Sequence, residues 1–312
     1  MEIDDMSMAA QGKEEIAVTV CVAAICHDAM IVGASDRMLS TPSIQFEPEK
    51  PKLVPLTSSI VAMNAGDESL QDEILQGVRR IVQEKVKAQP DVWLTVREVA
   101  TLYQQTLDAI KLRRAERSIL VPLGLTINSF TGQQAHMKSE VVSSLTQRLQ
   151  QYQVGQVASI ITGVDSDGPH IYVVRDGQIA FHDSVGFAAI GSGEAHAASE
   201  MMFSGHTRSR SLSETLLLVY TAKKRAEVSP HVGEATDMVT IGPQLGQGSS
   251  VTPEHLIAFD GIYRRMRERE MEAAAKAKEE MQQYDKKVRE KATVLEQNTE
   301  SAALDGSTIP VK

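Results

Sequence analysis

Runs of apolar residues near the start of the chain are separated by short polar turns, a pattern typical of buried antiparallel strands. Residues 18–26 (VTVCVAAIC) form a nearly continuous apolar run, and residues 29–34 (AMIVGA) repeat it after the turn His27–Asp28. A second such pair comprises residues 51–56 and 60–65. The first part of the chain therefore predicts two β-hairpins.

Two amphipathic helices are predicted to follow these hairpins. Asp67–Ser69 can cap a helix that ends near Ala88, and Thr95 opens a second helix. Helical spacing predicts the following core positions: Leu70, Ile74, Val78, Ile81 and Val82 in the first helix, and Val99, Leu102, Leu107, Ile110 and Leu112 in the second.

The later half of the chain adds further strands and two more helices. One helix follows the glycine-containing turn 191–193, and another spans residues 213–225 with Ser211 or Ser213 as its cap. Strands grouped together, with helices grouped between them, predict an α+β fold of stacked layers rather than alternating βαβ units. The expected strands are 160–164, 170–174, 179–182, 187–190 and 238–241.

Segments at both ends and in the middle of the chain do not fit this pattern. Residues 116–155 interrupt it, and we interpret them as an insertion with a polar helical part. Residues 1–18 contain five acidic residues and one lysine, which is typical of an N-terminal extension or propeptide. A single domain is then expected over residues 19–260, followed by a charged helical tail and a disordered C-terminus within 261–312.

The tail has a regular pattern of its own. Residues 264–291 contain strong helix formers and no Gly or Pro, with ten Lys or Arg against seven Asp or Glu. A thin seam of apolar residues recurs at alternating steps of three and four, as in a coiled coil. The segment is therefore either a solvated single helix or a helix that docks a partner or associates with itself. The seam consists of Ala274, Ala277, Met281, Tyr284 and Val288.

Composition excludes several classes of protein. A formal net charge of −9 argues against nucleic acid as a partner, and no apolar run is long enough to cross a membrane. The N-terminus lacks the basic and apolar regions of a secretory signal, so the two cysteines predict reduced thiols in the cytoplasm. No cluster of Cys or His has the spacing of a metal site.

Five segments resemble the proteasome β-type subunits and their bacterial relatives, within the N-terminal nucleophile hydrolases. The resemblance covers residues 19–241 and implies an αββα four-layer sandwich, in which two antiparallel sheets lie between layers of helices. It also implies a homo-oligomeric ring that acts on peptides or unfolded proteins without a metal or organic cofactor. The segments are TVCVAAICHDAMIVGASDRM, PKLVPLTSSIVAMNAGD, ITGVDSDGPHIYVVRDGQ, AAIGSGEAHAASEM and AEVSPHVGEATDMVTI.

The same resemblance implies a set of site residues. Asp36 and Lys52 match the aspartate and lysine beside the nucleophile, and Gly66 matches the glycine whose N–H lines the oxyanion hole. Ser192 and Ser229 match two serines that support the amine of the nucleophile. Without the resemblance, Asp36 could simply pair with its neighbour Arg37, and Ser192 could be a helix N-cap.

One residue departs from the family pattern on the amine side of this site. The aspartate that usually comes three residues before the second serine is Ala226 here, with Glu227 adjacent. The network around the amine therefore differs from that of the family.

The resemblance makes Thr19 the expected nucleophile, with Cys21 as a less favoured candidate. The interval from Thr19 to Asp36 is one residue longer than in the family, so we expect an insertion in the first hairpin near Gly33. In this family the threonine begins the mature chain, and its free α-amine acts as the base, for which a pKa near 8 is suitable.

Because Val18 precedes Thr19, the site requires either cleavage after Val18 or translation that starts at position 18, and otherwise it is inactive. Two functions remain open: a threonine-type hydrolase of peptide or amide bonds, or a non-catalytic ring or scaffold subunit that retains its N-terminal extension.

Overall fold

The first predicted hairpin lies at the centre of a five-stranded antiparallel sheet in the computed structural model, which describes residues 19–40, 45–48 and 51–304. The order of strands is β10-β1-β2-β11-β12. All of β1 is buried, in keeping with its continuous apolar sequence. The strands are β1 (Cys21–Cys26), β2 (Met30–Asp36), β10 (Phe187–Ile190), β11 (Thr236–Ile241) and β12 (Gly248–Ser250).

The pairing of β1 with β2 is uninterrupted from Cys21↔Ser35 to Cys26↔Met30. The two strands are joined by a short 3-10 turn, η1 (His27–Ala29), in which Asp28 and Ala29 have φ values of 59° and 56°. The pairing has no bulge at Gly33, the position near which we expected the hairpin to absorb an inserted residue.

The second predicted hairpin belongs to another five-stranded antiparallel sheet, of order β5-β6-β7-β8-β9. Its central strand β7 is buried along its whole length, whereas every residue of the edge strand β9 is exposed. A separate two-stranded ribbon pairs β3 (Leu39–Ser40) with β4 (Gln45–Phe46). The strands of the second sheet are β5 (Leu53–Pro55), β6 (Ile60–Gly66), β7 (Val157–Asp165), β8 (Gly168–Arg175) and β9 (Gln178–Phe181).

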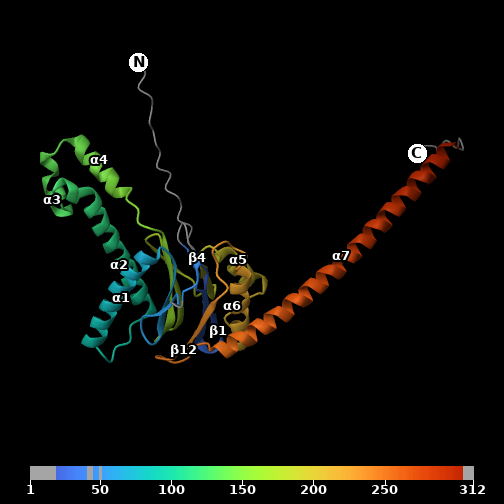
Figure 1. Cartoon of the computed structure of the whole chain (residues 1–312), viewed down its shortest axis with the longest axis horizontal. Helices are drawn as coiled ribbons and strands as arrows, with labels where there is room; N and C mark the ends of the chain where they lie inside the picture. Colours follow the sequence, from blue (N-terminus) through green and yellow to red (C-terminus); the bar gives the residue numbers. More distant parts are fainter. Residues whose placement is uncertain (1–18, 41–44, 49–50, 305–312) are drawn as a thin grey trace, which may run out of the picture. The chain divides into compact units, whose positions relative to one another are not determined.

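The two sheets pack face to face, with helices on both outer faces (Figure 1). Between the sheets lies a cluster that includes Ile25 and Ile31 from the first sheet and Met63 and Ile160 from the second. α1 (Glu68–Ala88) and α2 (Val96–Ala115) pack on the outer face of the second sheet. α5 (Glu194–Phe203) and α6 (Leu212–Ala226) cover the first sheet. The predicted αββα sandwich is confirmed, and its layers bury the apolar face of each sheet.

Local capping signals decide where several helices begin. Asp67 caps α1 by accepting the N–H of Leu70, and Thr95 forms a capping box with Glu98 at the start of α2. Of the two candidate caps for α6, the structure uses Ser211, which forms a capping box with Glu214. One core prediction is wrong: Leu112 is 56% exposed, because the end of α2 extends beyond the sheet that buries the rest of the helix.

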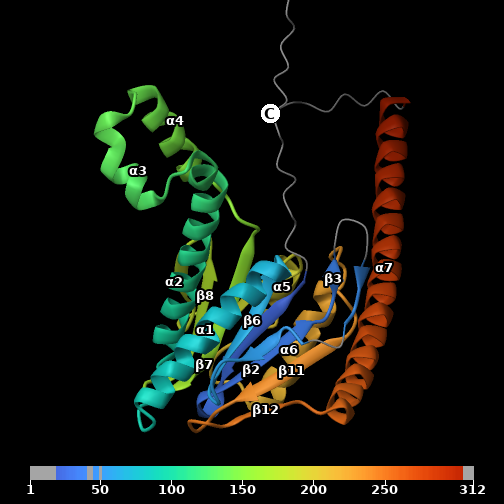
Figure 2. The ribbon, with the colours of Figure 1, turned by 60° about the vertical axis from the view of Figure 1, so that its left-hand side comes forward.

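Residues 116–155 are largely helical and have a small apolar cluster of their own. α2 continues without a break through η2 (Glu116–Leu120) and η3 (Val121–Leu123) into a segment with α3 (Ile127–Gln133), η4 (Gln134–His136) and α4 (Ser139–Gln150) (Figure 2). The cluster includes Ile119, Leu120, Phe130 and Leu145. The polar helix expected within this segment is α4.

The chain divides into two compact units, Met1–Thr252 and Pro253–Lys312. The second contains one continuous helix, α7 (Pro253–Leu304), so the division lies earlier than the boundary expected after residue 260. The helix includes residues 264–291, as predicted, but it also includes residues 293–304, which we expected to be disordered. No Gly or Pro occurs between residues 262 and 304, so no helix-breaking residue ends the helix before residue 304.

Residues 1–18, expected to be an extension or propeptide, and residues 305–312 lie outside the described part of the chain. Within the described residues, no helix is both long enough and apolar enough to span a membrane.

Candidate active site

Thr19 lies two residues before the start of β1, and Asp36 is the last residue of β2, so the hairpin brings the two residues together. The Thr19 hydroxyl donates a hydrogen bond to Asp36 Oδ1. The backbone holds this arrangement, because the Val20 N–H also donates to Asp36 Oδ1 (3.1 Å) and the Asp36 N–H donates to the Val20 carbonyl (3.2 Å). Thr19 and Asp36 are both fully buried.

Lys52 enters the same site from the segment that leads into β5 of the other sheet. Its Nζ lies 2.5 Å from Thr19 Oγ1, 3.2 Å from Asp36 Oδ1 and 2.5 Å from the Met38 carbonyl oxygen. The ammonium group thus has three acceptors, and only 11% of the Lys52 side chain is exposed. The Thr19 oxygen is therefore held between a cation that donates to it and a carboxylate that accepts its proton.

The Asp36 carboxylate is buried, and both of its oxygens accept hydrogen bonds. Its second oxygen, Oδ2, accepts the backbone N–H groups of Met38 (3.1 Å) and Gly233 (2.9 Å). Arg37, the neighbour that could have paired with Asp36, instead forms an ion pair with Asp237. A buried charge is tolerated where hydrogen bonds and a cation replace water, as they do here.

Ser192 lies on the backbone side of Thr19. The Thr19 N–H donates to Ser192 Oγ (3.3 Å), and the Ser192 hydroxyl is within hydrogen-bonding distance of the Thr19 and Pro230 carbonyl oxygens (3.2 and 3.3 Å). Ser229 supports this residue by donating to the Ser192 carbonyl (2.9 Å). Ser192 is not the N-cap of α5, because Gly193 occupies that position and no side chain caps the helix.

The backbone of Thr19 has a conformation that is rare for a β-branched residue. Its φ is 141°, a value that normally requires glycine and that costs about 1–3 kcal/mol in other residues. The turn after β10 holds the Thr19 carbonyl, which accepts the Gly193 N–H (3.2 Å). At Gly191 an added Cβ would lie 2.3 Å from that carbonyl oxygen, so only glycine fits there.

Glu227 does not take the place of the missing aspartate beside the Thr19 amine. Its Oε1 is bound by Lys223 Nζ (2.6 Å) and Lys224 Nζ (2.7 Å). Ala226 is fully buried and has no polar side chain to offer. The side chain that meets the Thr19 nitrogen is therefore that of Ser192, which Ser229 holds through its carbonyl.

Gly66 ends β6, on the strand that faces β1 across the sandwich. The two strands meet where Cys21 Sγ donates to the Asn64 carbonyl (3.5 Å), and Gly66 follows shortly after Asn64. Gly66 has φ 108°, and an added Cβ would lie 2.1 Å from the Gln156 carbonyl oxygen. Both features require glycine at this position, whereas its role in an oxyanion hole stays a prediction.

The structure argues against Cys21 as a nucleophile. The side chain is fully buried between the sheets, and burial raises the pKa of the thiol to about 12. The reactive form of cysteine is the thiolate, which is scarce at neutral pH when the pKa is so high. Cys21 is therefore a core residue, and Thr19 is the hydroxyl that meets Asp36 and Lys52.

Sequence reasoning missed Lys223, which holds the far side of the site. It is fully buried, and its Nζ donates to Glu227 Oε1 (2.6 Å) and to the carbonyl oxygens of Gly233 (2.8 Å) and Glu234 (2.9 Å). Since the Gly233 N–H binds Asp36, Lys223 fixes the backbone segment that orients the carboxylate. The available signal was its position on the apolar face of α6, four residues after Val219.

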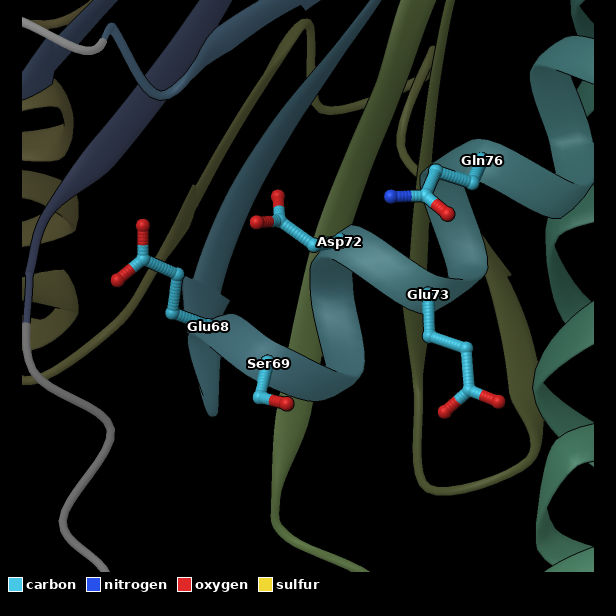
Figure 3. A pocket seen from close by; sticks show the side chains of 5 residues that line it. All are labelled: Glu68, Ser69, Asp72, Glu73 and Gln76. Carbon is cyan, nitrogen blue, oxygen red and sulfur yellow. The ribbon is translucent and has the colours of Figure 1, made fainter.

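An open acidic hollow lies at the first turns of α1, directly after Gly66 and Asp67. It has a volume of about 550 Å³ and is lined by Glu68, Ser69, Asp72, Glu73 and Gln76. In Figure 3 the side chains of Glu68 and Asp72 extend to the same side of the helix, whereas Glu73 points away from them. Glu73 forms ion pairs with Arg113 and Arg114 of α2.

No protein-family model matches the chain, and no curated protein matches it in sequence. Among the described residues, no three His, Cys, Asp or Glu side chains are grouped as a metal site.

Proposed function

We propose that the chain is a threonine-type hydrolase of peptide or amide bonds, similar to the proteasome β-type subunits, with Thr19 as its N-terminal nucleophile. One observation supports this proposal above the others: the Thr19 hydroxyl is held between Asp36 and Lys52, which come from different sheets. A structural subunit does not need a buried carboxylate and a buried cation around a single hydroxyl, because desolvating both groups is costly.

Each residue has a definite task in the proposed reaction. The Thr19 oxygen attacks the scissile carbonyl, and the proton of its hydroxyl passes to the free α-amine of the same residue. The Lys52 ammonium stabilises the oxygen as it loses this proton, and Asp36 holds the lysine in place through its ion pair of 3.2 Å. Ser192 lies within reach of the Thr19 nitrogen and orients the amine.

The intermediate is an ester between Thr19 and the acyl part of the substrate. The C–N bond breaks as the leaving amine takes the proton from the α-ammonium group, and water then hydrolyses the ester and regenerates the hydroxyl. The N–H of Gly66 is the expected donor to the oxyanion in both steps.

This mechanism needs a free amine on Thr19 and therefore cleavage between Val18 and Thr19, or translation that starts at position 18. The unusual φ of Thr19 supports cleavage. The φ torsion includes the carbonyl carbon of the preceding residue, so cutting that peptide bond removes the torsion together with its strain of about 1–3 kcal/mol. Strain at Thr19 thus favours the cleavage that would free the α-amine of Thr19.

A non-catalytic ring or scaffold subunit is the second candidate. Ala226 favours it, because the amine side lacks a carboxylate and Glu227 is paired with lysines. Under either function, a homo-oligomeric ring is the proposed assembly, which native mass spectrometry tests directly.

Mass spectrometry of the protein after treatment with an epoxyketone or a β-lactone separates the two functions. A hydrolase gives a chain that begins at Thr19 and carries one adduct on that residue, and a Thr19→Ala variant gives none. Thr19→Ser is the matched control, since it keeps a hydroxyl and should retain the adduct. An intact residue 1–18 segment without any adduct would overturn the proposed hydrolase.

A further inference from the structure

The helix α7 carries a line of exposed apolar side chains along an otherwise charged surface. Met281, Tyr284 and Val288 are 56%, 62% and 47% exposed. Together with Ala277 and Ala274 they recur at alternating steps of three and four residues, so they lie on one side of the helix. Such a seam remains in contact with water unless another helix covers it.

Charged residues flank this seam in a definite order. Lys278 follows Ala277, Glu280 precedes Met281, Asp285 follows Tyr284, and Lys287 precedes Val288. These are the positions from which side chains reach across to a partner helix in a two-stranded coiled coil. The signs of these four charges therefore indicate whether a parallel or an antiparallel second helix is favoured.

A parallel arrangement of two copies of this helix is disfavoured by its charges. In a parallel pair, each residue that precedes a seam position meets the flanking residue five positions later on the other helix. Glu280 of one copy would then lie opposite Asp285 of the second copy, and symmetry repeats this repulsion on the other side. The seam itself would place Ala277 against Ala277, which leaves that layer poorly filled.

An antiparallel arrangement satisfies both the charges and the packing. With the two-fold axis between Gln282 and Gln283, Glu280 lies opposite Lys287 of the second copy, and Lys278 lies opposite Asp285 of the second copy. Each of these pairs has opposite signs and occurs twice by symmetry.

The seam residues also complement each other in this register. Met281 meets Tyr284 of the second copy, which is a favourable contact of sulfur with an aromatic ring. The small Ala277 meets the larger Val288 of the second copy, so the layers have similar volumes.

We propose that α7 associates with α7 of a second copy of this chain as an antiparallel coiled coil centred between Gln282 and Gln283. The partner is another molecule of the same protein, and the interface consists of four seam residues, Ala277, Met281, Tyr284 and Val288, with their four flanking charges. The seam is short, so the association is weak and reversible and is stabilised by local concentration in any larger assembly. The proposal does not depend on the chemistry at Thr19.

Disulfide cross-linking of the full chain tests the register directly. Ala277→Cys and Val288→Cys variants are purified separately, mixed and oxidised. The antiparallel register predicts a mixed disulfide at least several-fold in excess over either symmetric disulfide, because the two positions meet only in the mixed pair. The native Cys21 and Cys26 are buried and do not compete. Glu279→Cys, on the far side of the helix, is the control for random collisions.

Charge exchange provides an independent test of the same interface. Lys287→Glu places like charges opposite each other and should lower the yield of the mixed disulfide several-fold. Adding Glu280→Lys to the same chain restores opposite signs and should restore the yield, with helicity checked by circular dichroism.

The proposal is wrong if symmetric disulfides dominate, or if the mixed product does not exceed the Glu279→Cys control. It is also wrong if the double charge exchange fails to restore the yield. Cross-linking identifies which residues of α7 meet. A ring formed by residues 19–252 would therefore not by itself produce the excess of mixed disulfide, and it would not prevent that excess.

Discussion

Replacing Lys223 with methionine is predicted to destabilise the sandwich strongly, although this residue does not touch Thr19. Methionine has a similar length and no charge, so the variant keeps most of the packing and removes the three donated hydrogen bonds. The carbonyl groups of Gly233 and Glu234 lose their donor, while Glu227 keeps Lys224.

The size of the effect follows from these contacts. A buried acceptor left without a partner costs about 1–3 kcal/mol. The variant leaves two such acceptors, the carbonyl groups of Gly233 and Glu234. Water that enters the site offsets part of this loss of stability. Breaking the buried ion pair with Glu227 adds to the loss. We therefore expect a loss of about 3–5 kcal/mol, a large share of the roughly 5–15 kcal/mol that stabilises a typical domain.

Urea denaturation followed by circular dichroism measures this loss, and Lys224→Met is the matched control. Lys224 binds the same Glu227 oxygen, but 15% of its side chain is exposed to solvent, whereas the side chain of Lys223 is fully buried. Its loss should cost no more than about 1 kcal/mol. Equal denaturation midpoints for the two variants would refute the reasoning that burial makes Lys223 structurally decisive.

Three further predictions concern the site and its surroundings. Lys52→Met should lower kcat for a fluorogenic peptide by about 10²–10³-fold in mature protein, because the Thr19 oxygen loses its cation; an unchanged rate contradicts the proposed role. Gly66→Ala should destabilise the protein, in thermal denaturation, by clearly more than Gly168→Ala. Both glycines have positive φ, but a Cβ at Gly168 meets open space, so equal losses would contradict the predicted clash with Gln156. Burial lowers the pKa of His206 below its ordinary 6.5, so the unfolded state binds a proton more readily than the folded state. The free energy of unfolding should therefore fall as the pH decreases below about 6.5, and urea midpoints of a His206→Gln variant should depend less on pH; parallel profiles would exclude this contribution.

Local patterns in the sequence were sufficient for much of the fold. The apolar runs on either side of His27–Asp28 predicted the first hairpin, because an antiparallel pair joined by a short turn needs no distant information. Asp67 and Thr95 marked the starts of α1 and α2 by their capping chemistry, which involves only the next few residues.

The candidate site could be predicted only in part. Thr19, Asp36, Lys52, Ser192 and Ser229 were singled out by resemblance, and the structure joins them by hydrogen bonds. The partner of Glu227 could not be foreseen, since a carboxylate next to Ala226 can turn either to Thr19 or to the lysines of α6.

The periodicity of strands and helices, the turns and the caps follow from the sequence alone, because each depends on neighbouring residues. The packed fold is needed to establish that Cys21 is a buried core residue, that Lys223 is a buried cation, and that Lys52 reaches Thr19 from the opposite sheet. These outcomes depend on residues far apart in the chain. The physical reason is desolvation: the surroundings that remove water from a side chain set its charge and its partners, and they exist only after the sheets have packed.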